Sequence, residues 1–290
     1  MAALEIMETP EARRWLGGIE PAWTLLDQTS FDALRDPSAP MRGVIRLAND
    51  LAQADVEHSA VARNALILMR AAAKGPGLKM TATGNLSRVE VARMCELFIW
   101  PDFDKDQMHQ FHKVINEPDF LPLYFVRHLV EGTGFLRRYK GHLRITPSGR
   151  KMLDEANRRA LPAVLFHIAI WHMDLGYLGR GLHAGWPQSD AGVVLWSLSV
   201  AANDWESPER LTRLCAIPIS DLFHIEWDTG AMALEARVLR PLLWSGLLDH
   251  KREKIEGSRF GERHFYRKTA LFDRMLKFHV ALEPPRGSAH

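Results

Sequence analysis

The sequence predicts a mainly helical protein with short β-hairpins, and two repeats support this prediction. Residues 78–84 (LKMTATG) and 143–149 (LRITPSG) carry the same pattern, a short apolar-alternating segment that ends on threonine and is followed by glycine. A threonine at this position can cap a helix that follows the strand. Residues 126–136 (VRHLVEGTGFL) also match residues 238–248 (VLRPLLWSGLL). Internal repeats of this kind predict a fold built from copies of one supersecondary unit.

The second repeat defines that unit. Gly134 aligns with Gly246, and downstream Thr146 aligns with Thr269, but the offset between the copies grows by eleven residues. The extra residues therefore fall between the two strands, at the tip of the later hairpin. We expect each copy to consist of a helix, a glycine stop, a strand, a tip, a second strand, a threonine cap and a further helix.

The elements before this unit have marked starts and stops. Thr9-Pro10-Glu11 supplies a cap, a proline and an acid at the start of the first helix. Proline and glycine then divide the chain into a second helix that reaches about residue 54 and a third at residues 61–74. A strand at residues 78–81 and the capping-box pattern Ser87-x-x-Glu90 follow, which predicts a helix over residues 88–98.

The remaining elements alternate helices with hairpin strands. Predicted helices cover residues 107–115, 119–131, 146–159, 163–175, 191–202, 209–215, 231–244 and 271–282, and predicted strands cover residues 135–139 and 142–145. Pro241 is expected to kink its helix or shorten it by the last turn. The expected domains are a helical N-terminal extension (residues 1–60) and two domains, residues 61–160 and 161–290.

Composition indicates a globular protein. The chain has 290 residues, of which 47% are hydrophobic, enough for sizeable cores. Acidic and basic residues interrupt the first twenty positions, so no secretory signal is predicted. The most apolar run, residues 161–178, contains charged and histidine residues and is predicted to be a core helix. Two well-separated cysteines, Cys95 and Cys215, predict no disulfide framework and a cytoplasmic location.

Positive charge is concentrated at the two candidate hairpins. Residues 127–151 contain seven lysines and arginines against one acid, and residues 251–268 contain seven against three. The net charge of the whole chain is only +2, so the rest of the chain is acidic. Cations gathered on hairpins of an acidic body are typical of a surface that faces a polyanion.

These residues resemble the winged helix-turn-helix superfamily. The phrase from Gly134 to Leu136, together with residues 143–150 (LRITPSGR), is similar to the hairpin ending of many bacterial regulators. The resemblance implies tandem winged-helix domains, with DNA binding as the usual function of the fold. Residues 64–155 also resemble uncharacterised bacterial proteins, some of which carry a C-terminal cysteine-rich zinc knuckle that this chain lacks.

The leading hypothesis is a bacterial or mobile-element regulator that binds double-stranded DNA. Lysines and arginines of the hairpins would contact phosphates, which dominate affinity. The later hairpin is the stronger candidate, because its long tip is basic and carries Phe260. We expect both hairpins to be free of neighbouring carboxylates. The candidate residues are Arg137, Arg138, Lys140, Arg144, Arg252, Lys254, Arg259, Arg263, Lys79 and Arg88.

One feature argues against reading of base edges and suggests an alternative. Residues 120–126 (FLPLYFV) offer almost no polar side chain to a major groove. The helix over residues 119–131 could instead be a protein interface, in a winged-helix adaptor or a homodimer. Phe120, Leu123 and Tyr124 would form that interface, so their exposure distinguishes the two hypotheses.

Metal and catalytic sites are weakly supported. Asp102-x-Asp104-x-Asp106 begins like a calcium loop, but glycine and the final acid are missing. His109 and His112 lack a firm third ligand. His167, His172 and Asp174 are the remaining catalytic or metal candidate, and we expect that role only if a closed pocket holds all three. The sequence contains no P-loop, Gly-x-Ser-x-Gly motif or Cys–His pattern, so we predict no enzyme, cofactor or metal.

Overall fold

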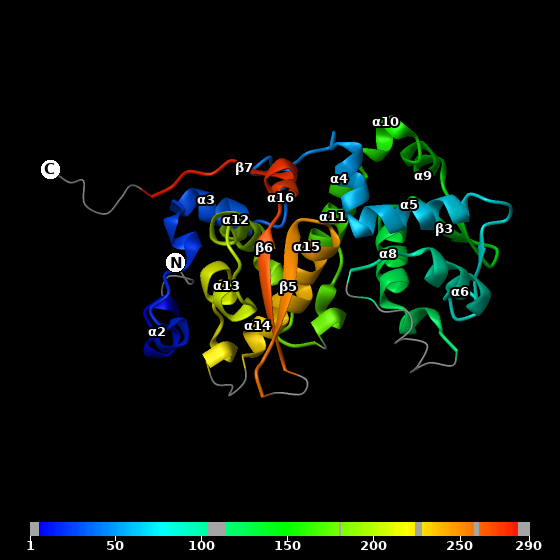
Figure 1. The fold of residues 1–290 in the computed structure, drawn as a ribbon. Helices are drawn as coiled ribbons and strands as arrows, with labels where there is room; N and C mark the ends of the chain where they lie inside the picture. The colour runs from blue at the N-terminus through cyan, green and yellow to red at the C-terminus, as the bar shows by residue number, and fades with distance from the viewer. Residues whose placement is uncertain are drawn as a thin grey trace. The chain divides into compact units, whose positions relative to one another are not determined.

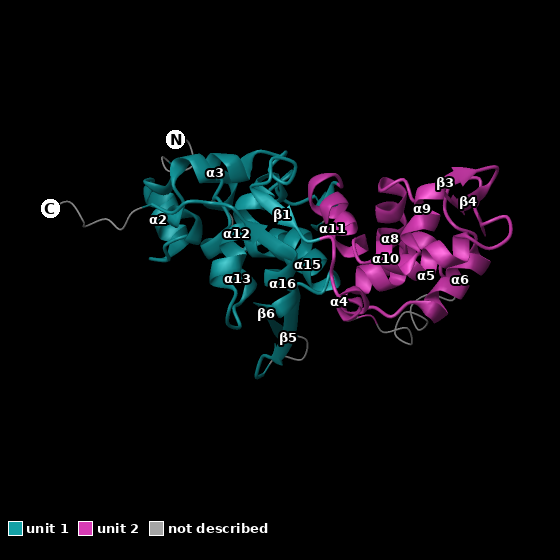
Figure 2. Ribbon diagram, turned by 90° about the horizontal axis from the view of Figure 1, so that it is seen from above, with its two compact units in different colours: residues 1–48, 174–290 teal, residues 49–173 magenta. Residues whose placement is uncertain are grey.

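The computed structural model describes residues 6–101, 103, 114–179, 181–223, 228–257 and 261–283. The chain is mainly helical with small antiparallel sheets, as predicted, and it forms two compact units (Figure 1, Figure 2). Unit 1 comprises Met1–Ala48 with Asp174–His290, and unit 2 comprises Asn49–Met173. No described helix is long and apolar enough to cross a membrane.

Unit 2 contains a helical core and a three-stranded sheet. Helix α5 (Ala60–Ala72) is buried along most of its length and packs against α8 and α11. The sheet is antiparallel with the order β2-β4-β3. The other elements are α4 (Gln53–His58), β2 (Leu78–Lys79), α6 (Arg88–Leu97), η2 (Glu117–Asp119), α8 (Leu121–Gly132), β3 (Leu136–Tyr139), β4 (His142–Ile145), α9 (Pro147–Met152), α10 (Glu155–Arg158) and α11 (Leu161–Trp171).

Unit 1 joins both ends of the chain. Its N-terminal part holds α2 (Pro10–Leu16), η1 (Ala22–Leu25), α3 (Gln28–Arg35) and β1 (Ile45–Leu47). After Asp174 follow η3 (Leu175–Gly179), η4 (Gln188–Asp190), α12 (Ala191–Ala201), α13 (Pro208–Cys215), η5 (Ser220–Phe223), α14 (Thr229–Leu234), η6 (Glu235–Leu239), α15 (Arg240–Trp244), β5 (Leu248–Lys254), β6 (Glu262–Lys268), α16 (Ala270–Met275) and β7 (Leu276–Phe278). The long hairpin β5–β6 is orange in Figure 1.

The predicted repeat is confirmed at the hairpins of both units. Gly134 and Gly246 both adopt positive φ, +73° and +79°, which favours glycine. Thr146 Oγ1 donates to the Gly134 carbonyl at 2.9 Å, and Thr269 Oγ1 donates to the Gly246 carbonyl at 2.8 Å. The extra residues of the later copy lengthen both strands and the tip. The two hairpins therefore share one corner geometry.

The order of elements repeats as well. In unit 2, α5, β2, α6 and α8 precede the hairpin β3–β4, and β2 pairs with β4. In unit 1 the hairpin β5–β6 is preceded by elements in the same order: α12, a single bridge residue in the place of a strand, α13 and α14–α15. The bridge residue Glu206 pairs with Tyr266 on β6, in the place where β2 pairs with Leu143 on β4.

The unit boundaries differ from the expected domains. The segment expected as a separate extension, residues 1–60, is divided between the two units, and α11 belongs to unit 2 although a boundary was expected near residue 160. Strand pairing explains part of the difference. β1 pairs with β7, with Ile45 opposite Phe278, so residues 1–48 are tied to the C-terminal segment.

Both of these strands replace helices that the sequence predicted. Residues 45–47 were expected within a helix that reaches about residue 54, and residues 276–278 within a helix over 271–282. In β1, Ile45 is 1% exposed and the next residue, Arg46, is exposed; Leu276 and Lys277 alternate in the same way in β7. This two-residue period is that of a half-buried strand, and three residues are too few to reveal it in sequence.

The first copy of the threonine motif does not form a strand-to-helix corner. The backbone N–H of Thr81 donates to the Asn85 carbonyl at 2.8 Å, and Met80 bridges Leu86, so residues 81–85 form a turn. Helix α6 begins after Ser87 as predicted, but Ser87 makes no side-chain cap. Glu90 instead accepts a hydrogen bond from the Lys79 backbone at 3.3 Å. Thr146, the second copy, caps its helix as expected, by accepting from the Gly149 N–H at 3.1 Å.

Pro241 changes its helix without ending it. The segment Glu235–Leu239 is π-helical and joins α14 to α15. Pro241 has no N–H to donate to the carbonyl four residues earlier. The helix widens locally into a π-helical turn, which accommodates the missing hydrogen bond. The predicted kink is thus a π-helical turn, and the chain remains helical to Trp244.

Candidate nucleic-acid interface

The register of the unit 2 sheet gathers basic residues on one face. Lys79 on β2 is opposite His142 on β4, which is opposite Tyr139 on β3. Arg144 is opposite Arg137 in the next row. Successive residues of a strand point to opposite faces, so all five side chains share a face. Together with Lys140 in the turn, these residues form what we call the basic sheet face.

Tyr139 lies at the centre of this face. This residue is 41% exposed. The charged groups of Arg137, Lys140 and Arg144 lie 5.4, 5.4 and 5.3 Å from the ring centre, within the range of cation–π contacts. One exposed aromatic ring is therefore surrounded by three cations from the two strands and their turn.

The cations of the basic sheet face have no carboxylate partner within the described ranges. Lys79, Arg137 and Lys140 are exposed, and none of them forms an ion pair there. Arg144 is half-buried, and its Nε donates to the Pro76 carbonyl at 2.7 Å. This hydrogen bond holds the guanidinium without neutralising it. The face thus keeps its full positive charge.

Arg138 behaves differently, although it is adjacent to Arg137 in sequence. It points to the opposite face of the sheet, and its Nε donates to Glu131 Oε1 at 2.8 Å. This hydrogen bond raises the pKa of Arg138. Its guanidinium also lies against Gly84, where a Cβ atom would be 2.9 Å from Nη1. The prediction that Arg138 contacts phosphate is therefore not supported, because Glu131 already holds its charge.

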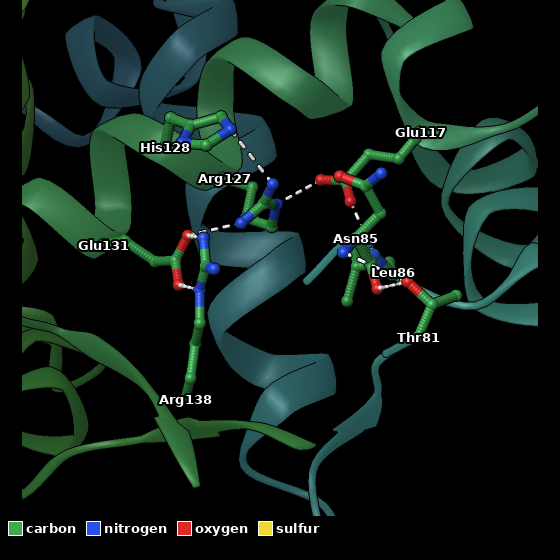
Figure 3. Close-up of polar contacts among 8 residues, drawn as sticks. All are labelled: Thr81, Asn85, Leu86, Glu117, Arg127, His128, Glu131 and Arg138. Carbon is green, nitrogen blue, oxygen red and sulfur yellow. Dashed lines mark hydrogen bonds and ion pairs between the residues drawn. The ribbon is translucent and has the colours of Figure 1, made fainter. Parts of the chain in front are cut away.

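Arg138 is the outer end of a buried polar network, shown in Figure 3. Glu131 also pairs with Arg127, and Arg127 pairs with Glu117. Glu117 is 0% exposed and accepts a hydrogen bond from the Leu86 backbone at 2.5 Å. Burial raises the pKa of the Glu117 carboxyl, against the opposing influence of Arg127. The network connects the start of α6, through α8, to strand β3.

The helices of unit 2 offer little to a major groove. Phe120 and Leu123 are 0% exposed and Tyr124 is half-buried, so the predicted protein interface on this helix is wrong for Phe120 and Leu123. These side chains form the core between α8 and its neighbours. On α6, Arg93 pairs with Glu90 at 2.8 Å, and the Arg88 Nε donates to Asn116 at 3.2 Å.

Arg88 and Lys79 line the same hollow, a cavity of about 700 Å³ beside the sheet. Glu90, Glu117 and Asp119 also line it. The predicted grouping of Lys79 with Arg88 is thus present, in a hollow that three acidic residues also line. Lys79 lies at the edge where this hollow meets the basic sheet face.

The hairpin β5–β6 of unit 1 does not match the expectation of free cations. Its basic side chains pair with carboxylates: Arg252 with Glu262 at 3.6 Å, Lys251 with Glu253 at 2.7 Å, Arg267 with Asp249 at 3.1 Å and Lys268 with Asp273 at 3.0 Å. Lys254 and Arg263 are exposed and form no ion pair within the described chain. Arg259 and Phe260 lie outside the described residues. This hairpin is therefore largely self-neutralised.

The histidine and metal candidates do not form a metal site in the described chain. His167 Nε2 and His172 Nε2 are 3.1 Å apart, and burial lowers the pKa of His167. No group of three potential metal ligands occurs among the described residues. Asp102, Asp104, Asp106, His109 and His112 lie outside that set. Cys95 and Cys215 are buried and are not joined in a disulfide.

Sequence reasoning missed Tyr139 and His142 as members of the site. The signal was present in residues 136–145 (LRRYKGHLRI), where a two-residue alternation places Arg137, Tyr139, His142 and Arg144 on one face. Counting cations over the hairpin grouped Arg138 with them and placed the emphasis on charge alone.

Comparisons with known proteins concern the same region. Residues 57–159 match the family described as the Y4jL N-terminal domain, and this range lies within unit 2. A curated relative, the uncharacterized protein y4jL of Sinorhizobium fredii (strain NBRC 101917 / NGR234), is 36% identical over 77 residues. The match covers 27% of this chain and 35% of the relative, so the chain spans about a third of that protein's length. No solved structure gives a significant match.

Proposed function

We propose that the protein binds DNA through the phosphate backbone, with the basic sheet face of unit 2 as the contact surface. The observation that carries this proposal is the set of cations on one face, Lys79, Arg137, Lys140 and Arg144, without carboxylate partners in the described chain. Cations that have no internal partner retain their full attraction for phosphates.

The order of elements also supports the proposal. Three helices, a hairpin and a first strand that pairs with the last one are the arrangement that the winged-helix resemblance implies. In that arrangement β3–β4 is the wing, which lies along the nucleic-acid backbone in many such proteins. The repeat in unit 1 has the same order, but four of the described cations of its hairpin, Lys251, Arg252, Arg267 and Lys268, are paired with carboxylates. We therefore assign the DNA contact to unit 2.

Salt titration tests the proposal. Four phosphate contacts predict that log affinity falls with log salt at a slope of about −3 to −4. The triple variant Lys79→Gln, Arg137→Gln, Lys140→Gln should weaken binding to every sequence by at least about tenfold and make the slope about 0.9 less steep for each cation replaced. Fluorescence anisotropy with random and genomic duplexes measures both quantities.

A matched control removes the same number of charges from unit 1. The variant Lys251→Gln, Arg252→Gln, Arg267→Gln alters cations that already pair with carboxylates. It should retain most of the affinity and the original slope. An equal loss of affinity in both variants would show that only the net charge matters, and a flat salt response in the wild type would refute the phosphate contacts.

A further inference from the structure

From the place of Tyr139 among the cations we infer that the basic sheet face binds single-stranded DNA, with an unpaired base stacked on the Tyr139 ring. This inference rests on the proposed function and specifies its substrate. Surfaces that bind single strands combine cations for the backbone with exposed aromatic rings for the bases. The basic sheet face has both components within one short hairpin.

The exposure of Tyr139 supports stacking. A tyrosine ring that serves only to pack a sheet would lie on the core side, as Leu136 and Leu143 do at 2% and 0% exposure. Tyr139 is on the outer side and is 41% exposed. In a duplex the bases are stacked on one another and present no free face to such a ring. An unpaired base presents its whole face, and every base has one.

The cations lie where the phosphates of a stacked nucleotide would need them. The three cations come from before, within and after the turn: Arg137, Lys140 and Arg144. Each charged group lies 5.3–5.4 Å from the centre of the Tyr139 ring. A base on the ring brings its flanking phosphates within reach of these groups. Lys79 extends the positive face across the sheet by one more strand.

The helices argue against a duplex. Reading of a major groove needs polar side chains on an exposed helix. The outward residues of α6 include Val89 at 78% and Leu97 at 47% exposure, while Arg93 is paired with Glu90. Helix α8 directs Phe125, Val126 and Leu129 into the core. Apart from Arg88 at the start of α6, which is bonded to Asn116, these residues offer little to base edges, whereas the sheet supplies a surface suited to base faces.

Substitution of the aromatic ring tests this inference. Fluorescence anisotropy compares a labelled oligothymidine of about fifteen nucleotides with a duplex of equal length. Tyr139→Leu should weaken oligothymidine binding about tenfold, and duplex binding by no more than about twofold. Tyr139→Phe keeps the ring and should bind oligothymidine like the wild type. Tyr177→Leu is the matched control, because Tyr177 is 43% exposed but belongs to unit 1.

The outcomes separate this inference from the proposed function. If the wild type binds both DNAs with a steep salt slope but Tyr139→Leu binds oligothymidine normally, or loses both DNAs equally, stacking is refuted and phosphate binding stands. A Tyr139→Phe variant as weak as Tyr139→Leu also refutes stacking, since the hydroxyl would then be the contact. If neither DNA binds the wild type, the proposed function itself fails.

Discussion

Four arginines of one sequence segment have three different environments. Arg127 is 1% exposed and lies between two glutamates. Arg138 is held by Glu131, while Arg137 and Arg144 face outward around Tyr139. Local charge density in the sequence cannot distinguish these residues. The strand register and the helix that packs beneath the sheet decide which guanidinium remains available to a ligand.

The buried end of this network gives a prediction about stability. Arg127→Met should lower the free energy of unfolding by about 3–5 kcal/mol, because Glu117 would remain buried without its cation. Urea denaturation followed by circular dichroism measures this loss.

The double variant Glu117→Gln, Arg127→Met provides the control. The amide of glutamine can still accept the hydrogen bond from the Leu86 backbone, but it carries no charge that would be left buried without a partner. The double variant should therefore be more stable than Arg127→Met alone, despite the additional substitution. Additive losses from the two single substitutions would contradict the ion pair as the reason for the cost.

At the scale of elements, the strand-to-helix corner of unit 2 depends on Gly149. A Cβ atom on Gly149 would lie 2.3 Å from the Phe135 carbonyl oxygen, so the chain must shift to accept any side chain. Gly149→Ala should cost about 2–3 kcal/mol of stability, and thermal or urea unfolding checks it. Gly141→Ala is the control, since Gly141 has a φ of +72° but open space around it, and should cost only about 1 kcal/mol. Equal losses would mean that the corner is not sterically tight.

The same elements show how much the sequence could predict. The hairpin strands, the Thr146 cap and most helices follow from glycine, proline and threonine, whose effects are local. Thr81 looks like Thr146 in sequence, but the chain reverses at Asn85 and the threonine serves a turn. β1 and β7 were missed because each exists only through its partner, more than two hundred residues away. Pairing of that kind leaves little trace in a short apolar segment.

Site prediction failed for a related reason. The cations of β5–β6 were favoured because the long tip of this hairpin is basic and carries Phe260. Cross-strand pairing brings Asp249 opposite Arg267, and Glu262 pairs with Arg252 on the facing strand, so a modest number of acids neutralises much of the hairpin. In β3–β4 the cross-strand neighbours are Arg137 with Arg144 and Tyr139 with His142, and no acid is present to pair with them.

For the whole molecule, the chain leaves unit 1 after Ala48 and returns at Asp174, so unit 2 is inserted into unit 1. The match to the Y4jL N-terminal domain, residues 57–159, falls inside the inserted unit. The basic sheet face also belongs to that unit. The region shared with another protein and the basic sheet face therefore lie in the same unit.

Acidification is expected to destabilise both units. Burial lowers the pKa of His128 and His167 in unit 2 and of His183 in unit 1. Each histidine therefore binds its proton more readily in the unfolded chain, where its pKa is about 6.5. Its contribution to stability is present above that pH and is lost as the pH falls toward the lower pKa of the folded state. His128 has an additional reason to stay neutral, because its Nε2 lies 3.0 Å from Arg127 Nη2, which can only donate.

Urea unfolding between about pH 7.5 and about pH 5.5 should therefore show a free energy of unfolding that becomes smaller as the pH is lowered. Glu117 acts in the opposite sense, because a raised carboxyl pKa means that the folded form holds its proton more readily. The variant His128→Gln separates the two contributions, since it removes one histidine and leaves Glu117 in place. Its stability should depend less on pH than that of the wild type over this range. A variant with the same pH dependence as the wild type would show that burial of His128 is not linked to folding.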